Sequence, residues 1–328
     1  MTRILRSIDP YIALMLLTVG LAAVCPAVGT GARVAGAAAD AGIVFLFFLY
    51  GSRLSPRAAL DGIMQWRLQI AVLVCTFALF PVLGVLIAQV APAVLPETLV
   101  SGILFLCLMP STVQSSIAFT SIARGNVPAA LCAASASNIL GVFVSPILAG
   151  WLLNISGVAV SFDVFRDIAL QLLAPFLVGQ MLRPVIGSWI QANKRVLGLA
   201  DRGSILLIIY VAFSNGMADH IWSNVDIADL ALLVAILGAL LAVVLVLTRM
   251  VAEKVMRLPI EDVIVLQFCG SKKSLASGLP MATVLVSGPQ LGLLVLPLML
   301  FHQIQLMVCT VLANRYAARS AVEAEATT

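Results

Sequence analysis

The chain has 328 residues, of which 62% are hydrophobic and only 10% are charged, and its formal net charge is +4. Its mean hydropathy of +1.10 excludes an ordinary soluble domain, in which about 45–50% of residues are apolar and about 25% are charged. A helical membrane protein tolerates this composition because the lipid bilayer solvates its outer face. The basic residues lie in short loops and carry no nucleic-acid signature. We therefore predict an all-α polytopic membrane protein that does not bind nucleic acid.

Ten apolar segments follow one another along the chain. They cover roughly residues 10–29, 37–52, 69–91, 99–122, 127–152, 164–183, 203–217, 227–249, 261–286 and 290–314. The first follows a basic start and resembles a signal peptide, but the many later segments favour a retained span. Segments 37–52 and 203–217 are shorter than the roughly 20 residues that cross a bilayer. Their length predicts tilted, packed or partial helices.

The loop charges predict the orientation of these ten spans. With the N-terminus in the cytoplasm, fifteen of the nineteen Lys and Arg residues fall on the cytoplasmic side. Arg33 and Arg166 fall on the other side, and the remaining two are Lys272 and Lys273. Cytoplasmic loops of membrane proteins carry such an excess. We therefore expect a multi-pass protein of the cell membrane, the inner membrane in a bacterium, with both termini cytoplasmic.

Ten spans divide into two sets of five, and an odd number of spans inverts the second set. We predict a first five-helix repeat over residues 1–155, a second, inverted repeat over 156–316 and a cytoplasmic tail over 317–328. The segments CLMPSTVQSS and FCGSKKSLAS match weakly, as do FLYGSRL and VAFSNGM, at separations of about 156 to 165 residues. Chance similarity is the alternative. Inverted repeats of this kind are typical of secondary transporters.

The fourth and ninth spans carry residues that interrupt helices. Pro110 lacks an amide donor and disfavours helix at Met109, and Gly270 permits non-helical torsions. Hydroxyl residues that suit the caps of restarting helices stand beside them: Ser111, Thr112, Ser271 and Ser274. Two broken helices at equivalent places indicate a transport site. The alternative is a pair of kinks with serines bonded to the preceding turn.

Lys272 and Lys273 stand inside the ninth span without a carboxylate at the centre of any span. Three hypotheses explain them. One ammonium replaces a bound cation among Ser hydroxyls, Gln114 and broken-helix carbonyls; or one binds an anionic substrate; or one carries protons. The structural alternative is a lysine that only holds the break. Since adjacent helical residues point about 100° apart, the two lysines are expected to have different surroundings.

Further polar residues stand in neighbouring spans. The tenth span contains His302, Gln303 and Gln305, and the fifth contains Ser135, Ser137 and Asn138. We predict that His302, Gln303 and the three residues of the fifth span contribute to the site, with Asn138 foremost in that span. For His302 a packing role is the competing interpretation.

The segment CLMPSTVQSSIAFTSIARGNVPAALCAASASNIL and the segments FCGSKKSLASGLPMA and LPLMLFHQIQLMV resemble the bile acid–sodium symporter family, in its divergent branch. Residues 105–146 and 267–310 carry the most specific similarity. The resemblance implies ten helices in two inverted repeats. Spans one, two, six and seven would form a panel domain, and the other six spans a core domain in which the broken fourth and ninth spans cross.

The resemblance also implies sodium ligands. The family's ligand pair in span four falls on Ser115 and Ser116, where typical members have Asn in second place, and further ligands fall near Ser135, Ser137 and Asn138. Typical members have a Glu in span nine, where this chain has Ser271, Lys272 and Lys273. We therefore expect sodium, if it binds, at Ser115, Ser116 and Asn138. No other cofactor is expected, and the coupling ion, sodium or proton, is left open.

These residues predict a secondary active transporter of a small organic anion that works by alternating access and is not an enzyme. The alternative is a membrane protein of the same fold that has lost transport and binds a regulatory partner. A third hypothesis is an intramembrane hydrolase with Ser271 or Ser274 and a lysine as its base. Adjacent or next-but-one positions on a helix argue against that dyad. The sequence makes no prediction of oligomeric state.

Overall fold

A computed structural model of the protein describes residues 10–53, 65–153, 170, 173–218, 225–286 and 290–325. Within these ranges all regular structure is helical and no strand occurs. The elements are α2 (Pro10–Val24), α3 (Gly29–Arg53), α5 (Trp66–Val74), η2 (Cys75–Leu79), α6 (Phe80–Val90), η3 (Ala91–Ala93), α7 (Glu97–Leu108), α8 (Val113–Ile122), α9 (Val127–Leu152), α11 (Ala174–Ala192), α12 (Lys194–Ala218), α13 (Ile227–Met250), η7 (Val251–Val255), α14 (Ile260–Gly270), α15 (Leu275–Leu285) and α16 (Leu291–Glu325).

The described helices are those of a membrane protein. Six helical stretches are long and apolar enough to cross a bilayer, and the bent pair α7–α8 raises the number to as many as seven. Because lipid offers no hydrogen bonds to exposed backbone, apolar helices of this length are a stable way to span it. The all-helical, polytopic class is thus confirmed, while the count of ten spans and their inversion remain predictions.

Two predicted segments are longer than expected. Segment 37–52 forms part of α3 and segment 203–217 part of α12, each a helix of 25 residues. The added turns contain Ala, Gly, Arg and Asp, which lower the local hydropathy, although Ala and Arg favour helix. Of the three predicted alternatives, partial helices are therefore wrong, and tilted or packed helices stay predictions.

Two other predictions fall partly on residues that the structure does not describe. The predicted boundary between the repeats, at 155 and 156, lies outside the described residues. So does most of the part of the predicted span 164–183 that precedes α11. Where a tail was predicted from residue 317, α16 continues as helix to Glu325.

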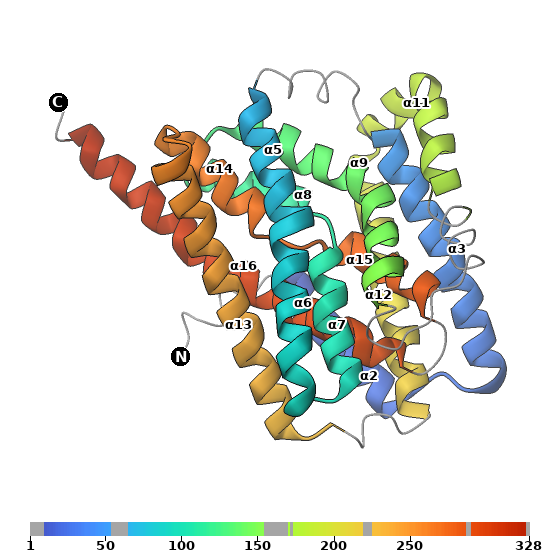
Figure 1. Ribbon diagram of the computed structural model, residues 1–328. Coiled ribbons are helices and arrows are strands. Elements are labelled where there is room, and N and C mark those ends of the chain that lie inside the picture. Colours follow the sequence, from blue (N-terminus) through green and yellow to red (C-terminus); the bar gives the residue numbers. More distant parts are fainter. Residues whose placement is uncertain are drawn as a thin grey trace. The chain divides into compact units, whose positions relative to one another are not determined.

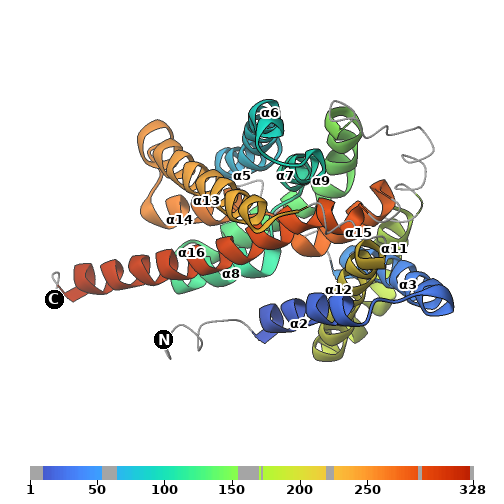
Figure 2. The same ribbon diagram turned by 90° about the horizontal axis from the view of Figure 1, so that it is seen from below.

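The chain forms two compact units. The first comprises Met1–Leu54, Ser161–Asp226 and Leu279–Val295. In it α12 packs against α2 and α3, and α11 packs against α3 (Figure 2). Buried Leu49, Ile190 and Leu197 form an apolar cluster among these helices. This unit therefore contains the described parts of the first, second, sixth and seventh predicted spans.

Two glycines allow α3 and α11 to approach closely. A Cβ atom added to Gly51 would overlap the carbonyl of Phe176, and one added to Gly179 would overlap the carbonyl of Phe48. Both obstacles are backbone atoms, so a side-chain rotation does not relieve them. Small residues commonly permit such contact between membrane helices.

Gly51→Ala and Gly179→Ala are expected to force α3 and α11 apart. Overpacking of this kind costs about 1–3 kcal/mol, and the backbone contact places the loss at the upper end. Thermal unfolding of the purified variants measures it. Gly36→Ala in the same helix is the matched control, because nothing lies within 4 Å of its added Cβ and Ala favours helix. Equal melting temperatures for Gly51→Ala and Gly36→Ala contradict the prediction.

The second unit comprises Ser55–Val160, Ile227–Gly278 and Leu296–Thr328. In it α6 lies beside α7, and α14 packs against α5, α8, α9 and α13 (Figure 1). Small side chains from α9 allow this packing, and they meet apolar residues of α5 and α14: Ala129, Ala130, Ala133 and Ala134 with Leu68, Val72, Val265 and Leu266. This unit carries the fourth, fifth and ninth predicted spans and thus the predicted site.

The polar link between α8 and α9 determines where α8 ends and where α9 begins. Arg124 adopts a positive φ of 58°, which ends α8. Asn126 caps α9, because its side-chain oxygen accepts a hydrogen bond from the amide of Ala129. Its Nδ2 donates to Asp262 at 2.8 Å. The link therefore fixes the start of α9 against the first turn of α14.

Candidate functional site

Both predicted helix breaks are present in the second unit. Helix α7 ends at Leu108 and α8 begins at Val113, and their axes differ by 64°. Met109, before Pro110, is extended with φ −75° and ψ 152°, as expected for a residue that precedes proline. Helix α14 ends at Gly270 and α15 begins at Leu275. The predicted interruptions are thus confirmed, and each contains four non-helical residues: 109–112 and 271–274.

The two breaks lie against each other and exchange hydrogen bonds. The amide of Ser274 donates to the carbonyl of Pro110 at 2.8 Å. In the other direction, the hydroxyl of Thr112 donates to the carbonyl of Lys273 at 3.0 Å and that of Ser111 to the carbonyl of Cys269 at 2.6 Å. At each break, backbone groups lose their helical hydrogen-bond partners. They find new partners in or next to the opposite break.

These contacts correct the predicted caps. Only Ser274 acts as one, by accepting a hydrogen bond from the amide of Ser277 at 3.2 Å. Ser111 and Thr112 bond across to the second break instead, and Ser271 donates back to the carbonyl of Gln267. Where two unwound segments meet, opposing carbonyls compete with the local amides for the hydroxyl groups.

Lys273 donates to a cage of three backbone carbonyls. Its Nζ lies 2.8 Å from the oxygen of Thr76, 2.8 Å from that of Cys107 and 2.7 Å from that of Met109. The face of the Phe80 ring lies 4.2 Å away, within the range of a cation–π contact. The three ammonium donors thus have three acceptors, and the side chain is completely buried.

Lys272 is equally buried but has different neighbours. Its Nζ has no hydrogen-bond acceptor among the described residues. It lies 4.0 Å from the centre of the Phe119 ring and 5.2 Å from that of Phe268. The expectation that the two lysines have different surroundings is confirmed. A buried ammonium without an acceptor is costly, so a residue kept in this state is a candidate for function.

Helix α9 fixes the first break from behind. Ser137 accepts a hydrogen bond from the amide of Ser111 at 3.0 Å. Asn138 donates to the carbonyl of Ser111 at 2.6 Å and accepts from the hydroxyl of Ser277 at 3.0 Å. Ser145 donates to the carbonyl of Leu108. Asn138 therefore bridges the first break to the first turn of α15.

Gln305 clamps the peptide group of Lys273. Its Oε1 accepts from the amide of Lys273 at 2.9 Å, and its Nε2 donates to the carbonyl of the same residue at 3.0 Å. The Nε2 also lies 2.8 Å from Nδ1 of His302. Because Nε2 carries only hydrogens to donate, Nδ1 must accept, which assigns the proton of a neutral His302 to Nε2. The sequence analysis noted the polarity of Gln305 but did not include it in the site.

Replacing Gln305 with Ala is expected to leave the amide of Lys273 without its acceptor, whereas the carbonyl of Lys273 keeps the hydroxyl of Thr112. An unsatisfied buried group costs about 1–3 kcal/mol, so the melting temperature should fall. Met307→Ala is the control, because Met307 lies on the same helix with its side chain 58% exposed. Equal melting temperatures for the two variants contradict the role assigned to Gln305.

The other predicted site residues differ in burial and in their contacts with the breaks. Gln114 is exposed, while Ser135 and Gln303 are half-buried. The hydroxyl of Ser116 lies 3.4 Å from the carbonyl of Phe268, and that of Ser115 is a buried oxygen without a hydrogen-bond partner among the described residues.

The oxygens of the predicted sodium ligands have different partners. That of Ser115 has no hydrogen-bond partner among the described residues, Ser116 donates to the carbonyl of Phe268, and Oδ1 of Asn138 accepts from Ser277. No Asp or Glu occurs among the buried polar side chains of the described residues. The ammonium groups of Lys272 and Lys273 add positive charge at the second break. Sodium at these three residues therefore stays a prediction.

The geometry also disfavours a Ser–Lys dyad. Ser271 donates to the carbonyl of Gln267, Ser274 pairs with Ser277, and Lys273 uses its three donors on carbonyls. Both serines and Lys273 are therefore engaged with other partners, and the Nζ of Lys272 lies over the rings of Phe119 and Phe268.

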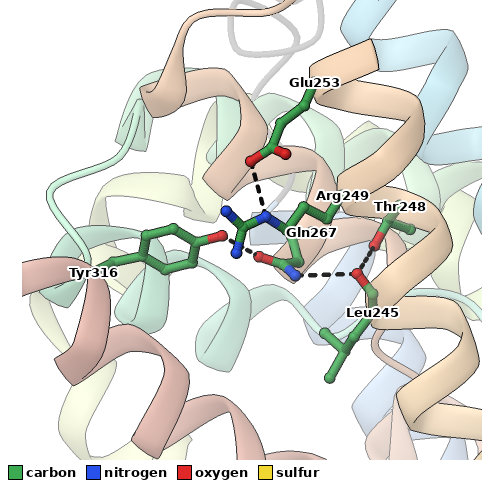
Figure 3. A network of polar contacts seen from close by, with 6 residues as sticks. All are labelled: Leu245, Thr248, Arg249, Glu253, Gln267 and Tyr316. Atoms are coloured by element: carbon green, nitrogen blue, oxygen red, sulfur yellow. Dashed lines mark hydrogen bonds and ion pairs between the residues drawn. The ribbon is translucent and has the colours of Figure 1, made fainter. Parts of the chain in front are cut away.

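A polar network holds α14 to its neighbours (Figure 3). The hydroxyl of Tyr316 donates to Oε1 of Gln267 at 2.6 Å, and Nε2 of Gln267 donates to the carbonyl of Leu245 at 3.1 Å. The hydroxyl of Thr248 also contacts that carbonyl. Arg249, the residue after Thr248, pairs with Glu253 of η7 at 2.8 Å. Gln267 therefore ties α14 to both α13 and α16, just before the second break.

Interrupted helices that meet at buried polar groups within an apolar helical fold define a membrane transport protein. The sequence pattern of the SBF-like CPA transporter family matches residues 9–318. The chain belongs to this family, which confirms the predicted relationship.

Relatives of the chain include bacterial and vertebrate proteins. "Uncharacterized protein PA2026" of Pseudomonas aeruginosa is 50% identical over 313 residues, which cover 95% of this chain and 93% of that protein. "Putative symporter YfeH" of Escherichia coli is 45% identical and covers 96% and 94%. "Sodium/bile acid cotransporter 7" of Rattus norvegicus is 26% identical and covers 82% and 80%. The similarity thus extends over most of the chain.

Proposed function

We propose that the protein is a secondary active transporter of a small organic anion, and that Lys272 provides the positive charge that attracts the anion. The observation that carries this proposal is a completely buried ammonium without a hydrogen-bond acceptor among the described residues. It stands beside two broken helices that hydrogen-bond to each other. An anionic group would supply the missing acceptor and offset the buried charge.

Transport by alternating access would be driven by a gradient of sodium or protons. The names of two relatives, a symporter and a sodium/bile acid cotransporter, support coupled transport. In this proposal the two compact units act as panel and core, the two sets of five spans are inverted repeats, and both termini lie in the cytoplasm. The excess of basic residues in one set of loops supports this orientation.

Uptake into proteoliposomes tests the proposal. Purified protein is screened against radiolabelled carboxylate, sulfate and sulfonate anions under sodium, proton or no gradient. We expect gradient-driven uptake of at least one anion. In Lys272→Met uptake should fall by about 100-fold, since removing one partner of a desolvated charge pair costs about 2–5 kcal/mol. Lys272→Arg should retain part of it.

Lys254→Met is the matched control, because Lys254 is exposed in η7 and should not affect uptake. Wild-type protein that neither binds nor transports any of the anions contradicts the proposal, as does full uptake by Lys272→Met.

A protein without transport activity that binds a partner is the second candidate. The absence of Asp and Glu among the buried polar side chains of the described residues favours it, since coupling ions are commonly held by intramembrane carboxylates. Co-purification of a stoichiometric partner, together with no uptake under any gradient, would select this function.

A further inference from the structure

We infer that the carbonyls of Thr76, Cys107 and Met109 form a site for a monovalent cation, and that the ammonium of Lys273 is its built-in occupant. The inference deepens the proposed function, because it states why no free ion is needed at this place in the transport cycle. It is argued from the three oxygens, each of which the local sequence leaves without its usual helical donor.

The carbonyl of Thr76 is free because of Pro81. In the wide helical turn of η2, the amide of Phe80 donates to the carbonyl of Cys75, five residues earlier. In the same pattern the next amide would serve Thr76, but that residue is Pro81, which has no N–H. A buried carbonyl without a donor is unfavourable. The sequence thus creates an acceptor at Thr76 that only a group from another segment can satisfy.

The carbonyls of Cys107 and Met109 are free because α7 ends between them. In a continuous helix the amide of Ser111 would donate to Cys107, but here it donates to the hydroxyl of Ser137. Met109 is extended and lies beyond the last helical turn. The C-terminal end of a helix also carries about half a negative charge. Both oxygens therefore favour a cation.

The three oxygens suit a bare cation as well as an ammonium group. Backbone carbonyls replace the hydration shell of monovalent ions in channel filters, and the Phe80 face at 4.2 Å adds a further attraction for positive charge. Lys273 meets all three at 2.7–2.8 Å. Lys272 has no such acceptors among the described residues, so the adjacent lysine provides an internal comparison.

Shortening Lys273 to Ala should vacate the cage and expose it to free cations. The melting temperature of Lys273→Ala is measured in choline chloride while sodium, potassium or ammonium chloride replaces choline at constant ionic strength. We expect a saturable rise on the order of 5 °C with at least one small cation, since a ligand that binds only the folded state stabilises it. The rise is counted as the excess over wild type, because a wild-type protein that couples transport to sodium would itself be stabilised by that ion.

Two variants control for general salt effects. Lys273→Met fills the same space without a charge, so it should gain nothing from any cation. Lys272→Ala removes a lysine whose Nζ has no hydrogen-bond acceptor among the described residues, and it should likewise show no saturable rise. A rise of equal size in either variant overturns the inference, as does a Lys273→Ala curve that follows wild type.

Where Lys273→Ala is too unstable for a melting curve, the amount of protein recovered from membranes is measured instead. Recovery from membranes only in the presence of a small cation supports the inference. Recovery in none of the salts contradicts it, because a vacated cage should accept the free ion. The measurement needs no transport activity, so its failure leaves the proposed function untouched, and a failed uptake screen leaves the cage untouched.

Discussion

Lys273→Met is expected to lower the melting temperature by roughly 10 °C, whereas Lys272→Met should leave it unchanged or raise it. The same substitution at adjacent positions thus has opposite effects. Methionine is unbranched like lysine, one atom shorter and uncharged. At position 273 it leaves three buried carbonyls without their donor. Each buried carbonyl left without a donor costs about 1–3 kcal/mol, and each kcal/mol corresponds to about 2–4 °C in a chain of moderate size.

At position 272 the substitution by methionine is expected not to lower the stability. The ammonium has no acceptor among the described residues, so its removal deletes an unfavourable buried charge. The loss is a cation–π contact of about 0.5–2 kcal/mol, and a methionine sulfur also packs favourably against Phe119 and Phe268. Thermal unfolding of both variants in one detergent buffer measures the difference. A similar decrease in both contradicts the assignment of separate roles.

Asn138→Ala should destabilise the second unit by about 1–3 kcal/mol, because the buried carbonyl of Ser111 loses its donor while the hydroxyl of Ser277 keeps only Ser274 as a partner. These contacts bridge the first break to α15. Hydrogen exchange followed by mass spectrometry should show faster exchange in peptides that cover residues 109–113 and 274–278. Peptides from α3, in the first unit, should not change.

Ser135→Ala provides the control for this change. Ser135 lies on the same helix, is half-buried and takes part in none of the contacts between the breaks. Its exchange pattern should match wild type. Faster exchange throughout both units in Asn138→Ala would show general unfolding and would contradict a local role.

The breaks were predictable because their cause is local. Pro110 cannot donate to the preceding turn, and Gly270 tolerates torsions that other residues avoid. The polar residues of α9 were predictable for a related reason, since Asn138 stands out in an apolar helix. Evidence from side-chain type was therefore sufficient for the positions of both interruptions and for the residue that bridges them.

The lysine cage was not predictable in detail, because its ligands are backbone carbonyls. Every residue has one, so Thr76 and Cys107 carry no signature of their role. The missing donor at Pro81 is a signal in principle, but its partner becomes clear only when the turn of η2 is known to be wide. The role of Gln305 was not predicted for a similar reason, since its partners are backbone atoms of Lys273 and not a side chain.

The long helix α16 is bound both to α14 and to the break that follows it, two segments that transport would have to move. Gln305 holds the peptide after α14, and Tyr316 holds Gln267 within it. These two contacts are eleven residues apart, about 16 Å along one helix axis. Rotation or sliding of α14 alone would break both contacts at once. The pair is therefore expected to travel as one rigid body, and the flexible points of any conformational cycle must lie elsewhere in the chain.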